Sequence, residues 1–278
     1  MNTLEMALLV WSASLGAGFL GALTGLGGGV VIVPLLTLGF GIDIRYAAGA
    51  SLISVIATSS GAAAAYVREG YSNVRIGMFL EIATTLGAIG GAYLAAHVAA
   101  STIGIIFGIV LMYSAFISRQ PQRDLPLSDK PDPLATRLRM NGTYPTPDGP
   151  KHYNVRNVPA GFGLMGLAGV LSGLLGIGSG AVKVLAMDQA MRLPFKVSTT
   201  TSNFMIGVTA AASAGVYLNK GYIDPGLAMP VMLGVVMGSV IGTRVLVKAK
   251  TQALRLVFAA VIFALGVEMI FNSVTGRI

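Results

Sequence analysis

Eight long apolar stretches fill most of this 278-residue chain, and they constrain its fold more than any other feature. Each approaches the roughly 20 residues that a helix needs to cross about 30 Å of hydrocarbon. Only 11% of the residues are charged, whereas an ordinary soluble domain has about 25%. The sequence therefore predicts an all-α polytopic membrane protein. The stretches are Met6–Leu23, Ala47–Val67, Ile76–Val98, Thr102–Ile117, Ala160–Leu175, Val197–Leu218, Leu227–Val247 and Leu256–Phe271.

The composition argues against several classes of function. The net charge is +8, but the basic residues are scattered between the apolar stretches and form no nucleic-acid-binding motif. The absence of cysteine excludes disulfides and thiolate metal sites, and two histidines give poor support for metal transport. The sequence offers no plausible pair of base and nucleophile and no nucleotide-binding motif. We therefore expect no catalytic residue, no metal, no cofactor and no nucleic-acid partner, and we do not expect an enzyme.

The chain contains an internal repeat with a constant offset of 151 residues. The segment "GLGGGVVIV" (25–33) aligns with "GIGSGAVKV" (176–184), and the register continues without a gap for about 70 residues. Chance similarity between two apolar sequences would not normally keep glycines and tyrosines in register over that length. We infer a duplicated unit. Among the aligned pairs are Ser51 with Ser202, Thr58 with Thr209, Tyr66 with Tyr217, and Gly87 with Gly238.

The duplication divides the chain into two transmembrane repeats, 6–118 and 159–273, joined by a polar linker. This linker, residues 119–158, is rich in proline, aspartate and basic residues and poor in aliphatic ones. Such a composition is typical of an extramembrane segment, and we expect it to be partly disordered.

The first glycine segment decides the orientation of the repeats. Residues 6–40 would form a helix of roughly 50 Å, too long for one upright crossing. One overlong tilted helix gives parallel repeats, with 11 basic residues on one face and 7 on the other. A hairpin broken at the glycines gives inverted repeats, with 15 on the linker's face and 3 opposite. The positive-inside rule favours the second arrangement. We expect two inverted repeats, each a Gly-interrupted helical hairpin plus three transmembrane helices, with a cytoplasmic linker and both termini outside.

The two glycine segments are the first candidate for a binding site. Irregular backbone at membrane depth is tolerated only inside protein or beside a wet cavity, and a helix N-terminus facing such a loop attracts anions. In an inverted pair, the two loops would converge near the membrane midplane. The alternative is that these glycines merely allow close helix packing.

Lys183 is the most informative single residue, because an ammonium at membrane depth is costly and usually faces a pathway or a partner. It follows the second glycine segment, and its counterpart in the first repeat is Ile32. We interpret it as the positive charge that meets an anionic substrate. The alternatives are a side chain that snorkels to the interface, or a structural pair with Asp188 or Glu268.

Polar side chains that follow the glycine segments complete the predicted site. The run "STTTSN" (198–203) offers hydroxyl and amide donors to oxyanion oxygens, although such hydroxyls often bond to their own helix instead. Glu81 is a candidate for ion coupling, and Tyr217 and Tyr222 suit an interfacial aromatic belt. The predicted substrate-binding residues are Gly27, Gly28, Gly29, Ser51, Gly178, Ser179, Gly180, Lys183, Thr201, Ser202 and Asn203.

These motifs resemble the TauE/SafE sulfite exporter family, also called the TSUP family of anion permeases. The resemblance is carried by "GLGGGVVIVPLL" (25–36), "AAGASLIS" (47–54), "GIGSGAVKV" (176–184) and "FKVSTTTSNFMIGVTAAASAGVYLNKGYIDP" (195–225), and it covers nearly the whole chain except the linker. It implies transport of sulfite, organosulfonates such as sulfoacetate, or related sulfur-containing anions. The sequence departs from the family pattern at Ser179, Leu185 and Ala50, which bears on the identity of the substrate.

Together these features predict a secondary transporter that works by alternating access in the cell (inner) membrane. Its expected partners are a small anionic substrate and the lipid bilayer, and the sequence is compatible with a homo-oligomer. An anion channel on the same scaffold is the alternative, and a membrane-embedded sulfur-delivery module is a weaker one.

Overall fold

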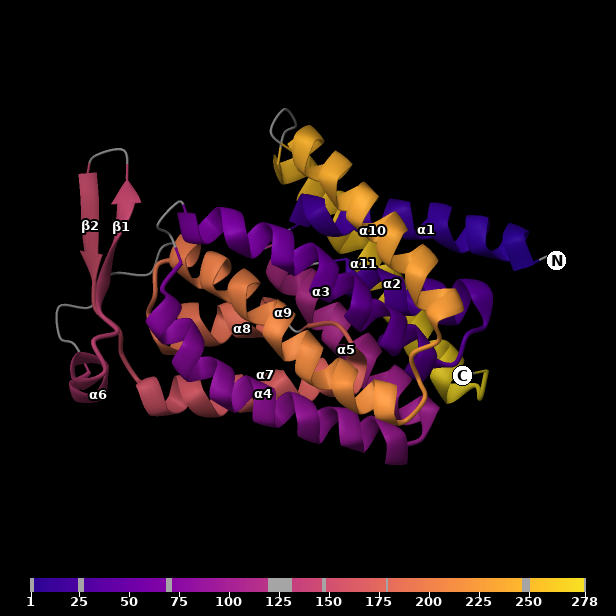
Figure 1. Ribbon diagram of the computed structural model, residues 1–278, viewed down its shortest axis with the longest axis horizontal. Coiled ribbons are helices and arrows are strands. Elements are labelled where there is room, and N and C mark those ends of the chain that lie inside the picture. Colours follow the sequence, from indigo (N-terminus) through magenta and orange to yellow (C-terminus); the bar gives the residue numbers. More distant parts are fainter. Residues whose placement is uncertain are drawn as a thin grey trace.

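The computed structural model describes residues 3–24, 28–68, 72–119, 132–146, 149–178, 180–246 and 251–277, and these residues are mostly helical (Figure 1). The first half contains α1 (Thr3–Thr24), α2 (Gly29–Pro34), the π-helical turn η1 (Leu35–Gly39), α3 (Ile44–Arg68), α4 (Val74–His97) and α5 (Ala100–Arg119). The second half contains α7 (Val158–Leu175), α8 (Gly180–Leu185), the π-helical turn η2 (Ala186–Ala190), α9 (Phe195–Asn219), α10 (Pro225–Leu246) and α11 (Thr251–Val274).

The element boundaries repeat with the offset found in the sequence. The elements α8, η2 and α9 begin and end 151 residues after α2, η1 and α3, and α10 and α11 begin 151 residues after α4 and α5. Each half therefore has a long helix, a short broken helix and three further helices in the same order.

Each half contributes helices to the packing of the other. Helix α1 packs along α10, and α7 packs along α4, so the first helix of each half lies beside the fourth helix of the other half. The long helices α3 and α9 pack against one another, and α5 packs against α11. These exchanged contacts bury two hydrophobic clusters, and each cluster draws residues from both halves.

Four helices within the described residues are long and apolar enough to cross a membrane: α1, α4, α7 and α10. Shorter apolar helices cover Gly29–Gly39, Ala100–Phe116 and Ala259–Val274. Large apolar side chains such as Leu86, Leu167 and Phe271 are exposed on the outer helices, where lipid is the natural solvent. The architecture is that of a helical membrane protein.

The described part of the linker contains secondary structure that the sequence did not predict. Its described part forms a short helix, α6 (Pro133–Arg137), and an antiparallel hairpin of β1 (Gly142–Thr146) and β2 (Gly149–Tyr153). Asp132 caps α6 through its carboxylate, which accepts from the Leu134 N–H at 2.8 Å and the Val158 N–H at 3.3 Å. The hairpin stands at one end of the long axis, and the N-terminal end of α1 lies toward the other (Figure 1).

Asn73 ties the hairpin to the helices. It is the N-cap of α4, and its side-chain amide donates to the Met140 carbonyl at 2.9 Å and to the Tyr153 hydroxyl at 2.7 Å. Its backbone N–H donates to Thr201 Oγ1 at 3.0 Å. Burial raises the pKa of Tyr153, and the Asn73 hydrogen bond opposes that rise. Folding therefore favours the neutral phenol. With respect to Tyr153, the free energy of unfolding is highest below pH 10 and falls as the pH rises through the raised pKa of the folded protein.

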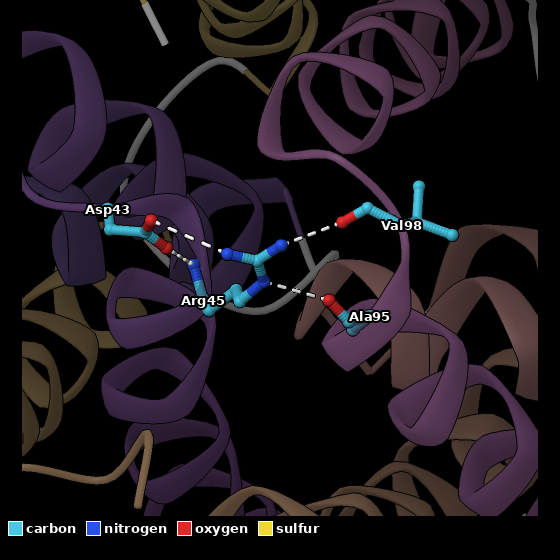
Figure 2. A network of polar contacts seen from close by, with 4 residues as sticks. All are labelled: Asp43, Arg45, Ala95 and Val98. Carbon is cyan, nitrogen blue, oxygen red and sulfur yellow. Dashed lines mark hydrogen bonds and ion pairs between the residues drawn. The ribbon is translucent and has the colours of Figure 1, made fainter. Parts of the chain in front are cut away.

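Arg45 binds the C-terminal end of α4, opposite the end that Asn73 caps. Figure 2 shows its guanidinium reaching from the start of α3 to the last turn of α4. Nε donates to the Ala95 carbonyl at 2.9 Å and Nη2 to the Val98 carbonyl at 2.7 Å, while Asp43 lies 3.7 Å from Nη1. The guanidinium also lies over the Tyr222 ring, 5.9 Å from its centroid. Arg45 thus satisfies carbonyls that the end of a helix leaves without partners.

We expect Arg45→Met to lower the free energy of unfolding by about 1–3 kcal/mol, because two charge-assisted hydrogen bonds are lost. Arg45→Lys should recover only part of that loss, since an ammonium cannot reproduce the planar fork. Thermal unfolding of the purified protein in detergent measures the effect. Equal stability of wild type and Arg45→Met would show that these bonds contribute nothing.

Glycines let the paired outer helices approach closely. A side-chain carbon at Gly173 would collide with the Ala88 carbonyl on α4, and one at Gly238 would collide with the Leu15 carbonyl on α1. We expect Gly173→Val to lower the free energy of unfolding by about 1–3 kcal/mol through overpacking. Gly163→Val on the same helix is the matched control, because no atom lies within 4 Å of its added carbon. The prediction fails if both variants unfold at the same temperature.

Candidate functional site

The two glycine segments meet beside Ser51, at the centre of the fold. Ser51 Oγ donates to the Gly176 carbonyl at 2.8 Å, and it lies 2.7 Å from where a side-chain carbon on Gly29 would be. The Cα of Ile177 lies 3.4 Å from that same point. Bulkier residues at Gly29 would push these segments apart. The structure therefore brings the start of α2 and the end of α7 into direct contact.

Lys183 lies on α8, three residues after its start, and is completely buried. Its Nζ donates to Thr209 Oγ1 at 2.5 Å, and Thr209 Oγ1 donates to Glu81 Oε1 at 2.6 Å. The three side chains come from three different helices, α8, α9 and α4. They form a chain from a cation through a hydroxyl to a carboxylate, which we call the Lys183–Thr209–Glu81 relay.

The two carboxylate oxygens of Glu81 differ in their hydrogen bonds. Oε1 accepts from Thr209 and, at 3.2 Å, from Thr85 Oγ1. Oε2 is buried and has no hydrogen-bond partner among the residues that the structure describes. The side chain as a whole is 7% exposed, although buried carboxylate oxygens ordinarily bind a donor. The free oxygen thus marks a position where a further group, such as a proton or a donor on a ligand, would be stabilised.

The three residues that the repeat relates to the relay carry no charge. The residues offset by 151 are Ile32 for Lys183, Thr58 for Thr209 and Met232 for Glu81. Ile32 is fully buried, and Thr58 Oγ1 bonds to the carbonyls of its own helix, at Ser54 and Val55. The duplicated scaffold thus holds an uncharged set at one position and a charged set at the equivalent position, and each set draws residues from both halves. The charged pair is therefore not a general feature of the repeat, which points to a function for it.

Several other predicted site residues use their polar groups to hold the backbone. Ser202 Oγ donates to the Gly180 carbonyl at 3.2 Å, and Thr201 Oγ1 accepts from Asn73 near the hairpin. Thr200, in the same run, bonds to carbonyls of its own helix. Asn203 is half-buried on α9. The structure thus separates the Thr201 hydroxyl, which lies beside the hairpin, from the relay.

The predicted glycines take different structural roles. Gly28 is the N-cap of α2, and a side chain there would meet Val235 of α10. Gly178 has a φ of +70° and faces Ile206 and Val55 at close range, so a side chain would be both strained and crowded. Gly29 and Gly180 are the first residues of α2 and α8. Gly27 and Ser179 lie outside the described residues.

The helices that follow the glycines are short and change their winding. Both α2 and α8 have six residues and continue directly into five-residue π-helical turns. The charged side chains at the site belong to the relay, and the sequence did not indicate Thr209 as a member.

The structure argues against two of the alternatives for Lys183 and corrects the expectation for Tyr217. Lys183 neither snorkels to a surface nor donates to Glu268, which lines a separate crevice of about 450 Å³ between α1, α2, η1 and α11. Tyr217 does not belong to an interfacial belt, because it is 1% exposed and its hydroxyl bonds to the carbonyls of Gly173 and Leu174. It satisfies the end of α7 just before the glycine segment. Among the described residues, no group of three or more His, Cys, Asp or Glu could hold a metal ion.

Comparison with known proteins gives a consistent result. The family model described as sulfite exporter TauE/SafE matches residues 10–269. A "Probable membrane transporter protein YunE" from Bacillus subtilis is 25% identical over 266 residues, covering 93% of this chain and 95% of the relative. The similarly named protein MJ0441 from Methanocaldococcus jannaschii is 25% identical over 268 residues, covering 91% of each chain. No solved structure matches the chain significantly.

Proposed function

We propose that this chain, which belongs to the sulfite exporter TauE/SafE family, is a secondary transporter of sulfite, organosulfonates or related small sulfur-containing anions. Its relatives are named as membrane transporters, which supports transport but leaves the substrate open. We assign the substrate class from the chemistry of the buried relay together with the family to which the chain belongs.

The observation that carries the proposal is the fully buried ammonium of Lys183 at the glycine segments. A cation in a dry interior is costly, so one that has no charged equivalent in the other repeat indicates a functional demand. An oxyanion beside Lys183 would gain a charge-assisted hydrogen bond from its ammonium and further bonds from neighbouring hydroxyls and backbone N–H groups. Ser202 Oγ already bonds to the Gly180 carbonyl at the start of α8, the helix that carries Lys183.

The directions of the helices support inverted repeats, a plan that many carriers use. Helix α4 begins at Asn73, beside the hairpin, and its last turn lies beside Arg45 at the other end. Helix α10 begins just after Tyr222, whose ring lies under Arg45, so α4 and α10 run in opposite directions. The glycine contacts place α7 parallel to α4 and α1 parallel to α10, which extends the opposition to the first helices. Equivalent elements also run in opposite directions in Figure 1.

The distribution of basic residues supports a cytoplasmic hairpin in the inner membrane. The hairpin end carries Arg75, Arg139 and Arg156, whereas the opposite end carries Arg45 and Lys220. Short basic loops remain preferentially in the cytoplasm. Both termini would then face outside. Cysteine-accessibility labelling of a single introduced cysteine at Lys151 tests this orientation in intact cells, because a cytoplasmic site resists a membrane-impermeant reagent.

Radiolabelled flux into proteoliposomes tests the transport itself. We expect wild-type protein to take up sulfite or an organosulfonate at a rate that saturates with concentration, and protein-free vesicles to remain empty. Large continuous currents without saturation would favour an anion channel on the same scaffold. Persistent turnover of a sulfur compound in detergent, without a membrane, would favour the sulfur-delivery alternative. No uptake of any tested sulfur anion would contradict the proposal.

A further inference from the structure

We propose that Glu81 is the proton-binding site of a coupled cycle in which the anion and one proton move together across the membrane. This inference rests on the proposed anion transport and adds its coupling ion. It starts from two features of the relay, the link from Lys183 to Glu81 through Thr209, and the free oxygen Oε2 of Glu81.

Binding of an anion would disturb the charge balance of the buried site. Without an anion, the ammonium of Lys183 and the carboxylate of Glu81 compensate one another across the Thr209 hydroxyl. A monoanion that binds beside Lys183 brings the site to a net negative charge in a medium of low dielectric, which is unfavourable. Uptake of one proton by Glu81 restores neutrality. The anion then becomes the counter-charge of Lys183, and Glu81 becomes a neutral acid.

The hydrogen bonds of Glu81 allow it to take up a proton without rearrangement. A proton on Oε2 would leave Oε1 free to accept from Thr209 and Thr85 as it does now, so no existing hydrogen bond need break. The proton comes from bulk water on the side that is open and returns to water on the other side. No oxidant, reductant or covalent step is involved. The relay thus stays intact while the charge of one member changes.

Among the side chains that the structure describes, Lys183 is the charged group linked to Glu81, through Thr209. Helix α4 packs against α7, α9 and α3. The described residues of α7 include no ionisable side chain, while Lys196 and Tyr217 lie toward the two ends of α9, and Arg45 and Tyr46 lie at the start of α3. On α4 itself, Arg75, Tyr93 and His97 lie near the ends of the helix, and the buried Asp188 lies on η2.

Proteoliposomes with a pH gradient and a clamped membrane potential test this coupling. The probe is labelled methanesulfonate, which is a permanent monoanion and cannot itself carry the proton; labelled sulfite is measured in parallel. We expect an outside-acid gradient of one pH unit to accumulate the anion roughly tenfold at equilibrium, with acidification of a trapped pH dye. Because the cycle is electroneutral, a change in membrane potential should leave accumulation unchanged.

Glu81→Gln removes the titratable group while its amide oxygen can still accept from Thr209. We expect the ratio of uptake with and without the gradient to fall to about one, while Glu268→Gln, in the separate crevice, keeps the wild-type ratio. If the pH gradient does not change uptake by the wild-type protein, the inference is overturned. It is also overturned if Glu81→Gln keeps the wild-type ratio of uptake with and without the gradient. The wild-type measurement is decisive even if that variant does not fold. If wild type transports neither anion nor any other sulfur anion, the proposed function itself fails.

Discussion

Replacing Lys183 with isoleucine is expected to lower the free energy of unfolding by about 3–5 kcal/mol, because it leaves the Glu81 carboxylate buried without its compensating charge. Adding Glu81→Met should restore most of that loss. These two replacements are the residues that the fold already holds at the equivalent positions, Ile32 and Met232. The double variant therefore reproduces a set of side chains that this scaffold already holds at the repeat-equivalent positions.

Unfolding titrations of the purified protein measure this cycle. The two single variants and the double variant give a coupling energy for Lys183 and Glu81, and Lys151→Ile on the exposed hairpin serves as the surface control. We expect the double variant to be closer to wild type than either single variant. Additive losses would show that the two charges do not interact, and the relay would then be a coincidence of packing.

The same double variant is expected to lose transport while it keeps the fold. Removal of the ammonium costs the anion a charge-assisted interaction of about 1.5–3 kcal/mol, which corresponds to a fall of roughly 10- to 150-fold in kcat/KM. Initial rates of sulfite uptake into proteoliposomes, at matched protein content, give this ratio. Thr58→Val is the matched control, because Thr58 is the repeat-equivalent of Thr209 but lies outside the relay and bonds to its own helix. Wild-type kinetics in the double variant would remove Lys183 from the site.

The sequence predicted the architecture well because the duplication is preserved in the register of individual residues. The offset of 151 residues, read from glycines and tyrosines, also relates the boundaries of α2 and α8, of η1 and η2, and of α3 and α9. Glycine patterns report backbone geometry directly, since a turn or a close helix contact requires them. The structured linker was missed because proline and charge dominate its composition, while the hairpin is held by a few specific contacts such as Asn73 with Tyr153.

The candidate site was harder to predict because its contacts join the two halves. Lys183 could be singled out from its charge, but its link to Glu81 requires α4 of one repeat to pack beside α9 of the other. Thr209 looked like an ordinary paired residue of the repeat, since its counterpart is also threonine. Ser202 and Thr201 were predicted as ligand donors, and in the structure their hydroxyls bond to backbone groups. A hydroxyl can bond to the backbone or to a ligand, and the sequence alone does not show which.

Counterflow is the sharpest test of carrier-type anion transport, because it requires a saturable carrier with a binding site for the anion. Vesicles are loaded with unlabelled sulfite and diluted into a trace of labelled sulfite. We expect a transient accumulation of label above its external concentration in wild-type vesicles, and little or none with the Lys183→Ile/Glu81→Met double variant. Label that only equilibrates in wild-type vesicles, or an equal overshoot in the double variant, would contradict it.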